Sequence, residues 1–227
     1  MSEPLVSVIV PFHNQERYLA EAVESILVQG HKPMELLLVD DGSTDASGSI
    51  ASRYLPPAHY VRRRNGGAAA ARNTGVAAAH GDLVAFCDSD DRWQPEKLAL
   101  QLGSFAADPD LDVSFTGMHE FVSPELDPAS LPARAPRQIA SGVGVSSMLA
   151  RRHVFSHVGR FDEQLRLGEW ADWYARLLES GCKVAIHPEI LVHRRLHDRN
   201  NTLTNWDDRG EYARIFKRAL DRRRNNE

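Results

Sequence analysis

The chain has 227 residues, enough for one fair-sized α/β domain or two small ones. Its 27 basic and 31 acidic residues give a net charge of −4, which argues against a general nucleic-acid binder whose affinity rests on neutralising phosphates. The two cysteines lie far apart, so neither a disulfide framework nor a zinc site is predicted. Because no secretory signal and no run approaching ~20 apolar residues are found, we expect a cytoplasmic protein that does not span a membrane.

Strands and helices alternate through the first ~100 residues. Apolar, β-branched runs predict buried strands at 5–12, 34–39 and 83–88, and a further short strand is expected at 58–64. Helical spacing predicts helices at 14–30, 46–54 and 68–80. This alternation predicts an α/β fold with a Rossmann-like, mostly parallel sheet flanked by helices, and with ligands at the carboxyl ends of the strands. A P-loop is absent, and no G-x-G-x-x-G follows the first strand, so an ATPase or a nicotinamide dehydrogenase has little support.

The alternation breaks in the second half of the chain. Residues 111–122 predict one or two strands, and the Pro-rich segment 123–137 predicts an adjustable flap that becomes ordered over a ligand. Further along we expect a strand, a short helix and a turn in 146–165, a helix at 169–181, two strand-like runs around His187 and Pro188, and a helix from Asn205. The basic tail "KRALDRRRNNE" suggests a local contact with an anionic or membrane surface, although a solvated amphipathic helix end is the simpler interpretation.

Three carboxylates, Asp88, Asp90 and Asp91, fall within four positions at the end of the apolar run 83–88. Like charges at this spacing repel, and partial burial at a strand end disfavours their ionised forms. A bound cation would remove that cost. An acidic turn that caps the following helix is the simpler alternative, but it needs one such residue and not three.

Four stretches, taken in order and spacing, resemble one known family. They are "VSVIVPFHNQERYL", "LLLVDDGSTD", "NGGAAAARNTGVAAAHGDLVAFCDSDDRWQPEKL", and "GRFDEQL" followed by "GEWADWYARLLESG". Together they resemble the inverting family 2 glycosyltransferases of GT-A fold over nearly all of residues 5–200. The resemblance implies a single GT-A domain over 1–227, made of a nucleotide-sugar-binding half (1–110), an acceptor-binding half (111–204) and a C-terminal helix (205–227).

By this resemblance "DSD" corresponds to the family's D-x-D motif, whose acids hold a divalent metal against the diphosphate of a nucleotide-sugar. Mn²⁺ or Mg²⁺ with oxygen ligands would stabilise the charge that accumulates on the leaving diphosphate. The resemblance implies that Asp90 binds the metal directly and that Asp88 lies beside the ribose and the metal. Asp91 and Trp93 are expected to cap and pack the next helix.

The resemblance also implies a set of donor-binding residues, namely Pro11, Phe12, Asn14, Glu16, Asp41, Arg72, Asp88 and Ser89. Asp41 resembles the acid that hydrogen-bonds a pyrimidine ring nitrogen, although turn and capping chemistry alone would also explain this acid. Arg72 resembles a basic residue near the phosphates, with a surface ion pair as an equal alternative. His197, together with Arg195, is a candidate to reach back to the metal or the diphosphate, although a lone histidine is more often only a hydrogen-bonding group.

The catalytic base is where the sequence departs from the family. Aligned on Arg176, the position of the family's catalytic Asp holds Trp170, which cannot accept a proton. Glu169 and Asp172 lie three residues apart on one face of the predicted helix, so either carboxylate is a candidate base. The alternative is that both acids only cap the helix and form salt bridges, while Trp170 and Trp173 form an aromatic platform for a sugar or acceptor ring.

The resemblance thus implies a metal-dependent transfer of a sugar, with inversion, from a nucleotide-sugar, with UDP favoured, to an unidentified acceptor. A small molecule, a peptide or a lipid-linked glycan all remain open as acceptors. Because of Trp170, a nucleotide-sugar-binding module without turnover is the competing hypothesis. Nucleotidyl transfer is disfavoured, since "PFHNQER" lacks the Gly-rich, basic loop that it would need.

Overall fold

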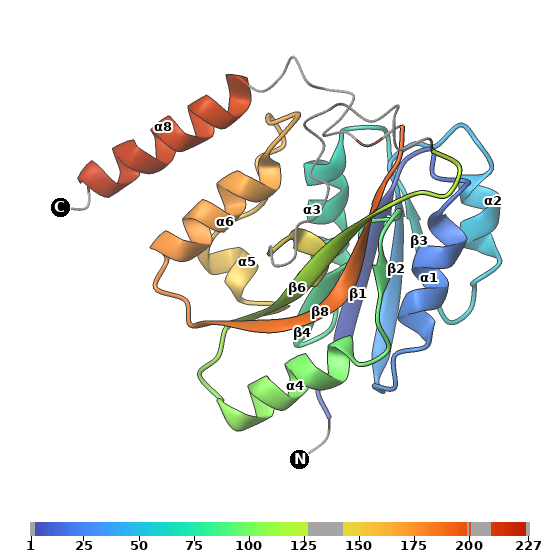
Figure 1. Cartoon of the computed structure of the whole chain (residues 1–227), viewed down its shortest axis with the longest axis horizontal. Helices are drawn as coiled ribbons and strands as arrows, with labels where there is room; N and C mark the ends of the chain where they lie inside the picture. Colours follow the sequence, from blue (N-terminus) through green and yellow to red (C-terminus); the bar gives the residue numbers. More distant parts are fainter. Residues whose placement is uncertain (1–2, 127–142, 199, 201–209, 226–227) are drawn as a thin grey trace.

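The computed structural model describes residues 3–126, 143–198, 200 and 210–225. Most of the predicted flap, 127–137 of the segment 123–137, therefore lies outside the described residues, as do 205–209 of the predicted C-terminal helix. Figure 1 shows a central sheet with helices on both of its faces, and a last helix, α8, at one end of the molecule.

Within the described residues, eight strands form one sheet in the order β3-β2-β1-β4-β7-β6-β8-β5. The strands are β1 (Val6–Phe12), β2 (Met34–Asp40), β3 (His59–Arg62), β4 (Leu83–Phe86), β5 (Arg92–Trp93), β6 (Val113–Val122), β7 (Met148–Arg151) and β8 (Val184–Leu196). Strands β1 to β4 pair in parallel, as do β6 and β8, whereas β7 and β5 pair antiparallel to their neighbours. The α/β class and the mostly parallel sheet are confirmed.

The helices bury two apolar cores, one on each face of the sheet. They are α1 (Leu19–Leu27), α2 (Ser47–Ser52), α3 (Ala68–Ala78), α4 (Lys97–Ala107), the 3₁₀ helix η2 (Val145–Ser147), α5 (Val154–His157), α6 (Glu169–Glu179) and α8 (Gly210–Asn225). Helices α1, α2 and α4 contribute to one core, and α3, α5 and α6 to the other. The parallel strands β1, β2 and β4 are buried almost throughout, which explains why the sequence shows continuous apolar runs there, whereas β3, at the edge of the sheet, is partly exposed.

Helix α3 lies unusually close to the sheet because its side chains are small. A Cβ added at Gly75 would come within 2.3 Å of Cγ2 of Ile9 on β1, so no larger residue fits at this position without a shift. The Ala-rich α3 packs on β1 and β2, and this brings Arg72 within hydrogen-bonding distance of Asp88, which follows β4.

Sequence analysis predicted two short strand-like runs around His187 and Pro188, but the structure has a single strand, β8, in this region. It is one strand of 13 residues, in which Pro188 falls at an irregularity of the pairing with β6. The register shifts on either side of Gly117, whose added Cβ would lie 3.1 Å from the carbonyl oxygen of Glu189. A bulge accommodates a proline that has no N–H to donate to the ladder, so the strand continues through it.

Candidate functional site

The carboxyl ends of β1, β2 and β4 meet at one edge of the sheet, where ligands collect in doubly wound folds. Pro11 and Phe12, at the end of β1, are both buried. Asn14 follows them with φ of 53°, and its Oδ1 accepts a hydrogen bond from the backbone N–H of Thr44 at 2.8 Å. Glu16 likewise accepts from the N–H of Ala46 at 3.0 Å. Asn14 and Glu16 therefore hold the loop after β2 in place beside the end of β1.

Asp41 anchors the loop that leads into α3. Its buried carboxylate accepts hydrogen bonds from the backbone N–H groups of Gly66, at 3.1 Å, and Gly67, at 2.7 Å, and forms an ion pair with Arg63. Its neighbour Asp40 is also buried. Burial opposes the ionisation of Asp40, but hydrogen bonds from Tyr60 and Ser43 outweigh it and lower the pKa of this carboxyl.

Arg72 connects the two sides of the site. This buried guanidinium donates from Nη2 to Oδ1 of Asp88 at 2.8 Å and from Nη1 to Oε1 of Glu169 at 2.6 Å. Burial works against its charge, but the two carboxylates outweigh burial and raise its pKa. Arg72 is thus no surface arginine. It joins the acid after β4 to the first residue of α6, which lies 97 positions away in the chain.

Asp90 and His197 form a second pair at the same edge of the sheet. Nε2 of the buried His197 lies 2.9 Å from Oδ2 of Asp90, and Nδ2 of Asn200 lies 3.2 Å from the same oxygen. The ring of Tyr18 packs on the His197 ring with centroids 4.6 Å apart. Arg195 donates from Nε to the backbone carbonyl of Asp90 at 3.2 Å, so it positions this acid through the main chain.

The third acid of the cluster has a structural role. Asp91 is buried and accepts hydrogen bonds from Oγ of Ser146, at 2.7 Å, and from the N–H of Arg195, at 3.3 Å. Burial, together with the charges of Asp90 and Asp88, raises its pKa well above the usual range. The expectation that Asp91 caps the next helix is wrong, because α4 begins only at Lys97 and no side-chain hydrogen bond caps it.

Two more residues of this stretch are placed by the structure. Trp93 is buried in β5, and its Nε1 donates to the carbonyl oxygen of Ser146 at 2.9 Å. Ser89 is buried between Asp88 and Asp90, two of the three acids in the cluster.

The two candidate bases both lie on α6, but their surroundings differ. Glu169 is bound to Arg72, which places it at the edge of the sheet described above. Asp172 is buried and accepts a hydrogen bond from Nε of Arg176 at 2.9 Å. Arg222 of α8 lies 3.9 Å from the Asp172 carboxylate. Within the described residues, no side-chain hydrogen bond caps the amino end of α6, so neither acid acts as the cap of this helix.

The two tryptophans of α6 also differ in how deeply they are buried. Trp173 has 0% of its surface exposed, stacks on Phe155 and on Phe161, and donates from Nε1 to the carbonyl oxygen of Gly159 at 2.9 Å. It is a core residue, so its predicted place in an aromatic platform is wrong. Trp170 is partly exposed, and its ring stacks on that of Tyr174 with centroids 5.5 Å apart.

The structure adds residues that sequence analysis missed. Glu120 and Arg194 face each other across β6 and β8, 2.5 Å apart, and Tyr18 supports His197 from α1. Burial, and to a smaller extent the charge of Glu169, raises the pKa of Tyr212 on α8. Tyr18 lies in the first family-like stretch, but Glu120, Arg194 and Tyr212 lie outside the four stretches. Only the pairing of distant strands and helices brings them to the site.

The side chains at this edge of the sheet supply part of the ligands that a divalent cation needs. A carboxylate and an imidazole meet at Asp90 and His197, and such cations in phosphate-transfer sites often take only one or two protein ligands besides phosphate oxygens and water. Among the described residues, no group of three or more His, Cys, Asp or Glu side chains is arranged to hold a metal. A metal bound at Asp90 and His197 would therefore need further oxygen ligands from a bound nucleotide-sugar.

Two solved structures share this fold. Mannosyltransferase PcManGT from Pyrobaculum calidifontis, in complex with GDP-Man and Mn²⁺, matches with a TM-score of 0.74 and 19% identity, over 97% of this chain and 65% of that chain. S. aureus TarS 1–349, in complex with UDP-GlcNAc, matches with a TM-score of 0.71 and 22% identity, over 88% of this chain and 60% of that chain. The fold is that of the GT-A glycosyltransferases.

The sequence comparisons give the family. The family model for glycosyl transferase family 2 matches residues 7–156, and the chain belongs to this family of enzymes. An uncharacterized glycosyltransferase of Rickettsia typhi is 28% identical over 234 residues, which cover 96% of this chain and 72% of that protein. TuaG of Bacillus subtilis, a putative teichuronic acid biosynthesis glycosyltransferase, is 41% identical over 119 residues, 51% of this chain and 47% of that protein.

This chain spans less than two thirds of TuaG and of both solved structures. Among the described residues, no helix is both long and apolar enough to cross a bilayer.

Proposed function

We propose that the protein transfers a sugar, with inversion at the anomeric carbon, from a nucleotide-sugar to an acceptor hydroxyl. The observation that carries this proposal is the bridge through Arg72, which joins Asp88 on the donor side to Glu169 on the acceptor side. A single guanidinium thereby keeps a carboxylate of α6 next to the edge of the sheet where the donor binds in this fold class.

In this proposal Glu169 is the general base. The acceptor hydroxyl attacks the anomeric carbon from the face opposite the diphosphate, and Oε of Glu169 takes its proton as the new glycosidic bond forms. The bond to the diphosphate oxygen breaks with its electron pair, so a single displacement inverts the configuration. Asp172 is disfavoured as the base, because Arg176 and the buried surface around it occupy its carboxylate.

Arg72 has a positioning role in this scheme. It fixes the orientation of Glu169 and keeps a permanent positive charge beside the position of the departing diphosphate. Trp170, which is partly exposed next to Glu169, supplies the aromatic surface for a sugar or acceptor ring.

Metal dependence is part of the proposal. Asp90 and His197 would hold Mn²⁺ or Mg²⁺, with Asp88 beside it, and the cation would stabilise negative charge on the leaving diphosphate. Asp41, with Pro11 and Phe12 at the end of β1, would seat the base, and a uracil base is favoured through a hydrogen bond to Asp41. The neighbour TarS was crystallised with UDP-GlcNAc, which supports a UDP-sugar, whereas PcManGT carries GDP-Man.

A panel of nucleotide-sugars tests the proposal. We expect one of them to raise the melting temperature only when Mn²⁺ or Mg²⁺ is present, and to be slowly hydrolysed when no acceptor is added. No stabilisation by any UDP- or GDP-sugar would contradict the donor site.

The second candidate is a nucleotide-sugar-binding module without turnover. It is favoured by one observation, that Trp170 stands where the family's catalytic Asp is expected, while Glu169 is held by Arg72. Metal-dependent stabilisation by a donor, without hydrolysis and without transfer to any acceptor offered, would select this candidate.

A further inference from the structure

Helix α8 has one side packed on α6 and one side open to solvent. On the packed side, Glu211 accepts hydrogen bonds from the backbone N–H groups of Arg166 and Leu167, and Ile215 is buried. Arg218 pairs with Asp162 at 3.0 Å and Arg222 with Glu179 at 2.6 Å. These contacts fix which side of α8 faces away from the molecule.

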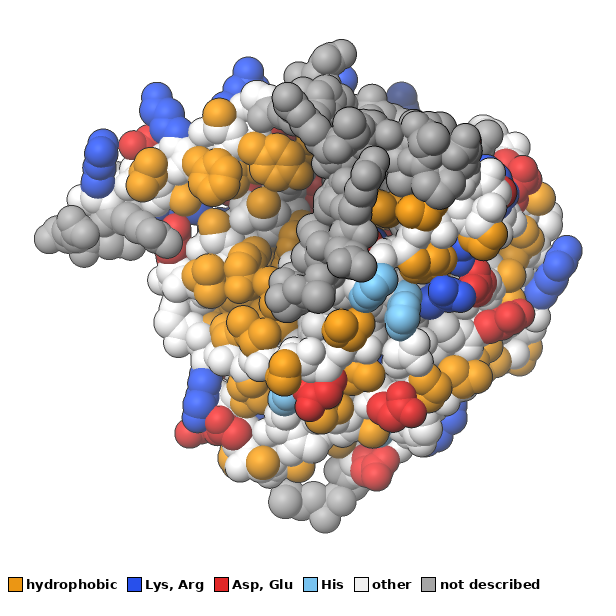
Figure 2. Space-filling model, viewed as in Figure 1, with side chains coloured by type: hydrophobic (Ala, Val, Ile, Leu, Met, Phe, Trp, Pro, Cys, Tyr) orange, Lys and Arg blue, Asp and Glu red, His pale blue; other side chains and the backbone are white. Residues whose placement is uncertain are grey.

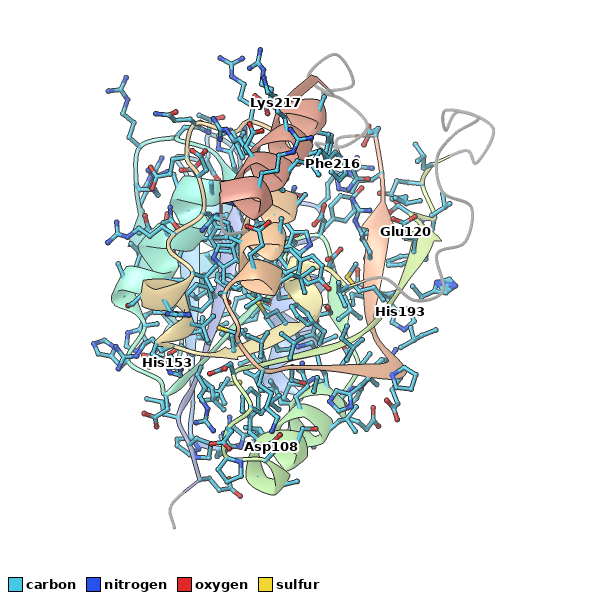
Figure 3. The ribbon with its side chains drawn as sticks, turned by 90° about the vertical axis from the view of Figure 1, so that its left-hand side faces the viewer. Asp108, Glu120, His153, His193, Phe216 and Lys217 are labelled. Atoms are coloured by element: carbon cyan, nitrogen blue, oxygen red, sulfur yellow. The ribbon has the colours of Figure 1, made fainter. Side chains whose placement is uncertain are left out.

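Two large apolar side chains occupy the open side. Phe216 is 68% exposed and Leu220 is 55% exposed, and both lie one helical turn apart on the same face. Such an apolar pair is costly in water, and the packing of α8 on α6 does not require it, because Ile215 already provides the buried apolar contact. Figure 3 shows Phe216 and Lys217 at the outer side of this helix.

Basic side chains lie on the exposed side of α8 beside this apolar pair. Lys217 and Arg224 are next to it, whereas Arg214 points away from Phe216. Arg214, Lys217 and Arg224 are exposed, and none of them has an ion-pair partner among the described residues. Asp221 is the one acid on the exposed side of the described part of α8. A chain with a net charge of −4 therefore carries a local surplus of positive charge around two exposed apolar side chains. Figure 2 shows basic side chains projecting along the edge of the α8 end of the molecule, with apolar ones beside them.

We propose that this outer face of α8, made of Phe216, Lys217, Leu220 and Arg224, docks on an anionic membrane surface. Phe216 and Leu220 would enter the boundary between headgroups and acyl chains, while the cations contact anionic headgroups through long, flexible stems. The small apolar area alone gives weak binding, so the cations supply a necessary second contribution.

A second copy of the chain fits this face less well. In a two-fold symmetric contact the same patch meets itself, so Lys217 and Arg224 would face an identical pair of cations. Two apolar side chains are also far below the ~800 Å² that each partner buries in a stable interface. A planar anionic surface satisfies the charges and covers both apolar side chains at once.

The test is cosedimentation of the protein with lipid vesicles. We expect binding to vesicles of phosphatidylcholine with phosphatidylglycerol at low salt, weak binding at high salt, and no binding to phosphatidylcholine alone. Phe216→Ser with Leu220→Ser should lower the partition coefficient at least about tenfold. Lys217→Gln with Arg224→Gln should lower it about fivefold for each cation removed.

Matched controls come from elsewhere on the surface. Ile186→Ser with Ile190→Ser changes two exposed apolar residues of β8, and Arg53→Gln with Arg64→Gln changes two exposed cations. Both control variants should bind the anionic vesicles as the unchanged protein does. Circular dichroism shows whether each α8 variant keeps its helix. Hydrogen exchange of the unchanged protein should show added protection of amides in 210–225 when vesicles are present.

Several outcomes would overturn the proposal: no binding to anionic vesicles, equal binding to neutral ones, or binding that survives both α8 variants. Self-association that the Phe216 and Leu220 changes abolish, without vesicle binding, would instead assign this face to a second copy of the chain. Because donor binding is not measured, these results are independent of the proposed transfer reaction.

Discussion

Nη1 of Arg72 and Oε1 of Glu169 lie 2.6 Å apart, although the two residues are 97 positions apart in the chain. The other nitrogen of the same guanidinium binds Asp88. The position of Glu169 is therefore fixed by a residue that also contacts Asp88, the acid of the proposed donor site. This coupling links the geometry of the proposed base to that of the proposed donor site.

Glu169→Gln should lower turnover by ~10²- to 10⁴-fold with little change in donor affinity, because it removes the proton acceptor and keeps the size of the side chain. Asp172→Asn is the matched control on the same helix. It should leave turnover nearly unchanged and lower the free energy of unfolding by ~1–3 kcal/mol, since it weakens a buried, charged hydrogen bond with Arg176. Rates with the donor found in the panel, and urea melts, measure the two effects.

The reverse pattern, in which Asp172→Asn loses turnover and Glu169→Gln keeps it, would assign the base to Asp172. Should both single variants and the double variant turn over at the original rate, neither carboxylate is the base.

Arg72→Lys should separate binding from catalysis. Lysine keeps the positive charge but lacks the planar, forked set of N–H donors of arginine. One of the two carboxylates therefore loses its hydrogen bond. We expect a ~10- to 100-fold lower turnover from the mispositioned Glu169, and a smaller change in donor affinity. Arg72→Met leaves two acids facing a buried apolar side chain and should cost ~3–5 kcal/mol of stability. An Arg72→Lys variant with unchanged kcat would show that the bridge has only a structural role.

The first half of the fold could be predicted from sequence because its signals are local. The strands β1, β2 and β4 lie in apolar runs, and the small residues of α3 indicate its close approach to β1 at Gly75. The acids at the strand ends were placed correctly at one edge of the sheet, since parallel strands share that edge.

The remaining features depend on contacts between residues that are distant in sequence. The spacing of α6 places Trp170 and Trp173 on neighbouring faces, but only the packing of α5 decides that Trp173 is the buried one. Asp91 looked like a helix cap because Asp is favoured there, yet Ser146 and the backbone of β8 bind it instead. Likewise, Pro188 suggested a break, whereas pairing with β6 carries β8 through it.

Asp90→Asn should abolish metal-dependent binding of UDP, and His197→Gln should weaken it. Both changes remove a ligand that the cation can use, and few other protein ligands are available at this site among the described residues. Calorimetry with Mn²⁺ or with EDTA measures the effect. Asp91→Asn is the control within the same cluster, because this acid is bound to Ser146 and Arg195. Unchanged nucleotide affinity in EDTA and in both variants would refute metal dependence.

A buried lysine on α4 gives a prediction that does not depend on the site. Lys97 is fully buried, and its Nζ donates to Oε1 of Gln101 at 2.8 Å and lies 4.0 Å from the centroid of the Trp93 ring. Among the described residues, no carboxylate forms an ion pair with it. Burial therefore lowers the pKa of Lys97 to about 7, from an ordinary value of 10.5.

Stability should consequently rise with pH between about 7 and 10.5, because in this window the unfolded chain binds a proton at Lys97 and the folded chain does not. The free energy of unfolding, taken as the difference between the unchanged protein and Lys97→Met, should increase by about 1.4 kcal/mol per pH unit across the middle of that window. Urea melts of both proteins at several pH values give this difference and cancel the titration of every other group. Lys183→Met is the control, since a hydrogen bond with Asp108 raises the pKa of Lys183, and its stabilisation is fully present below pH 10.5 and constant across the window. A flat difference for Lys97→Met would mean that this lysine stays protonated in the folded protein.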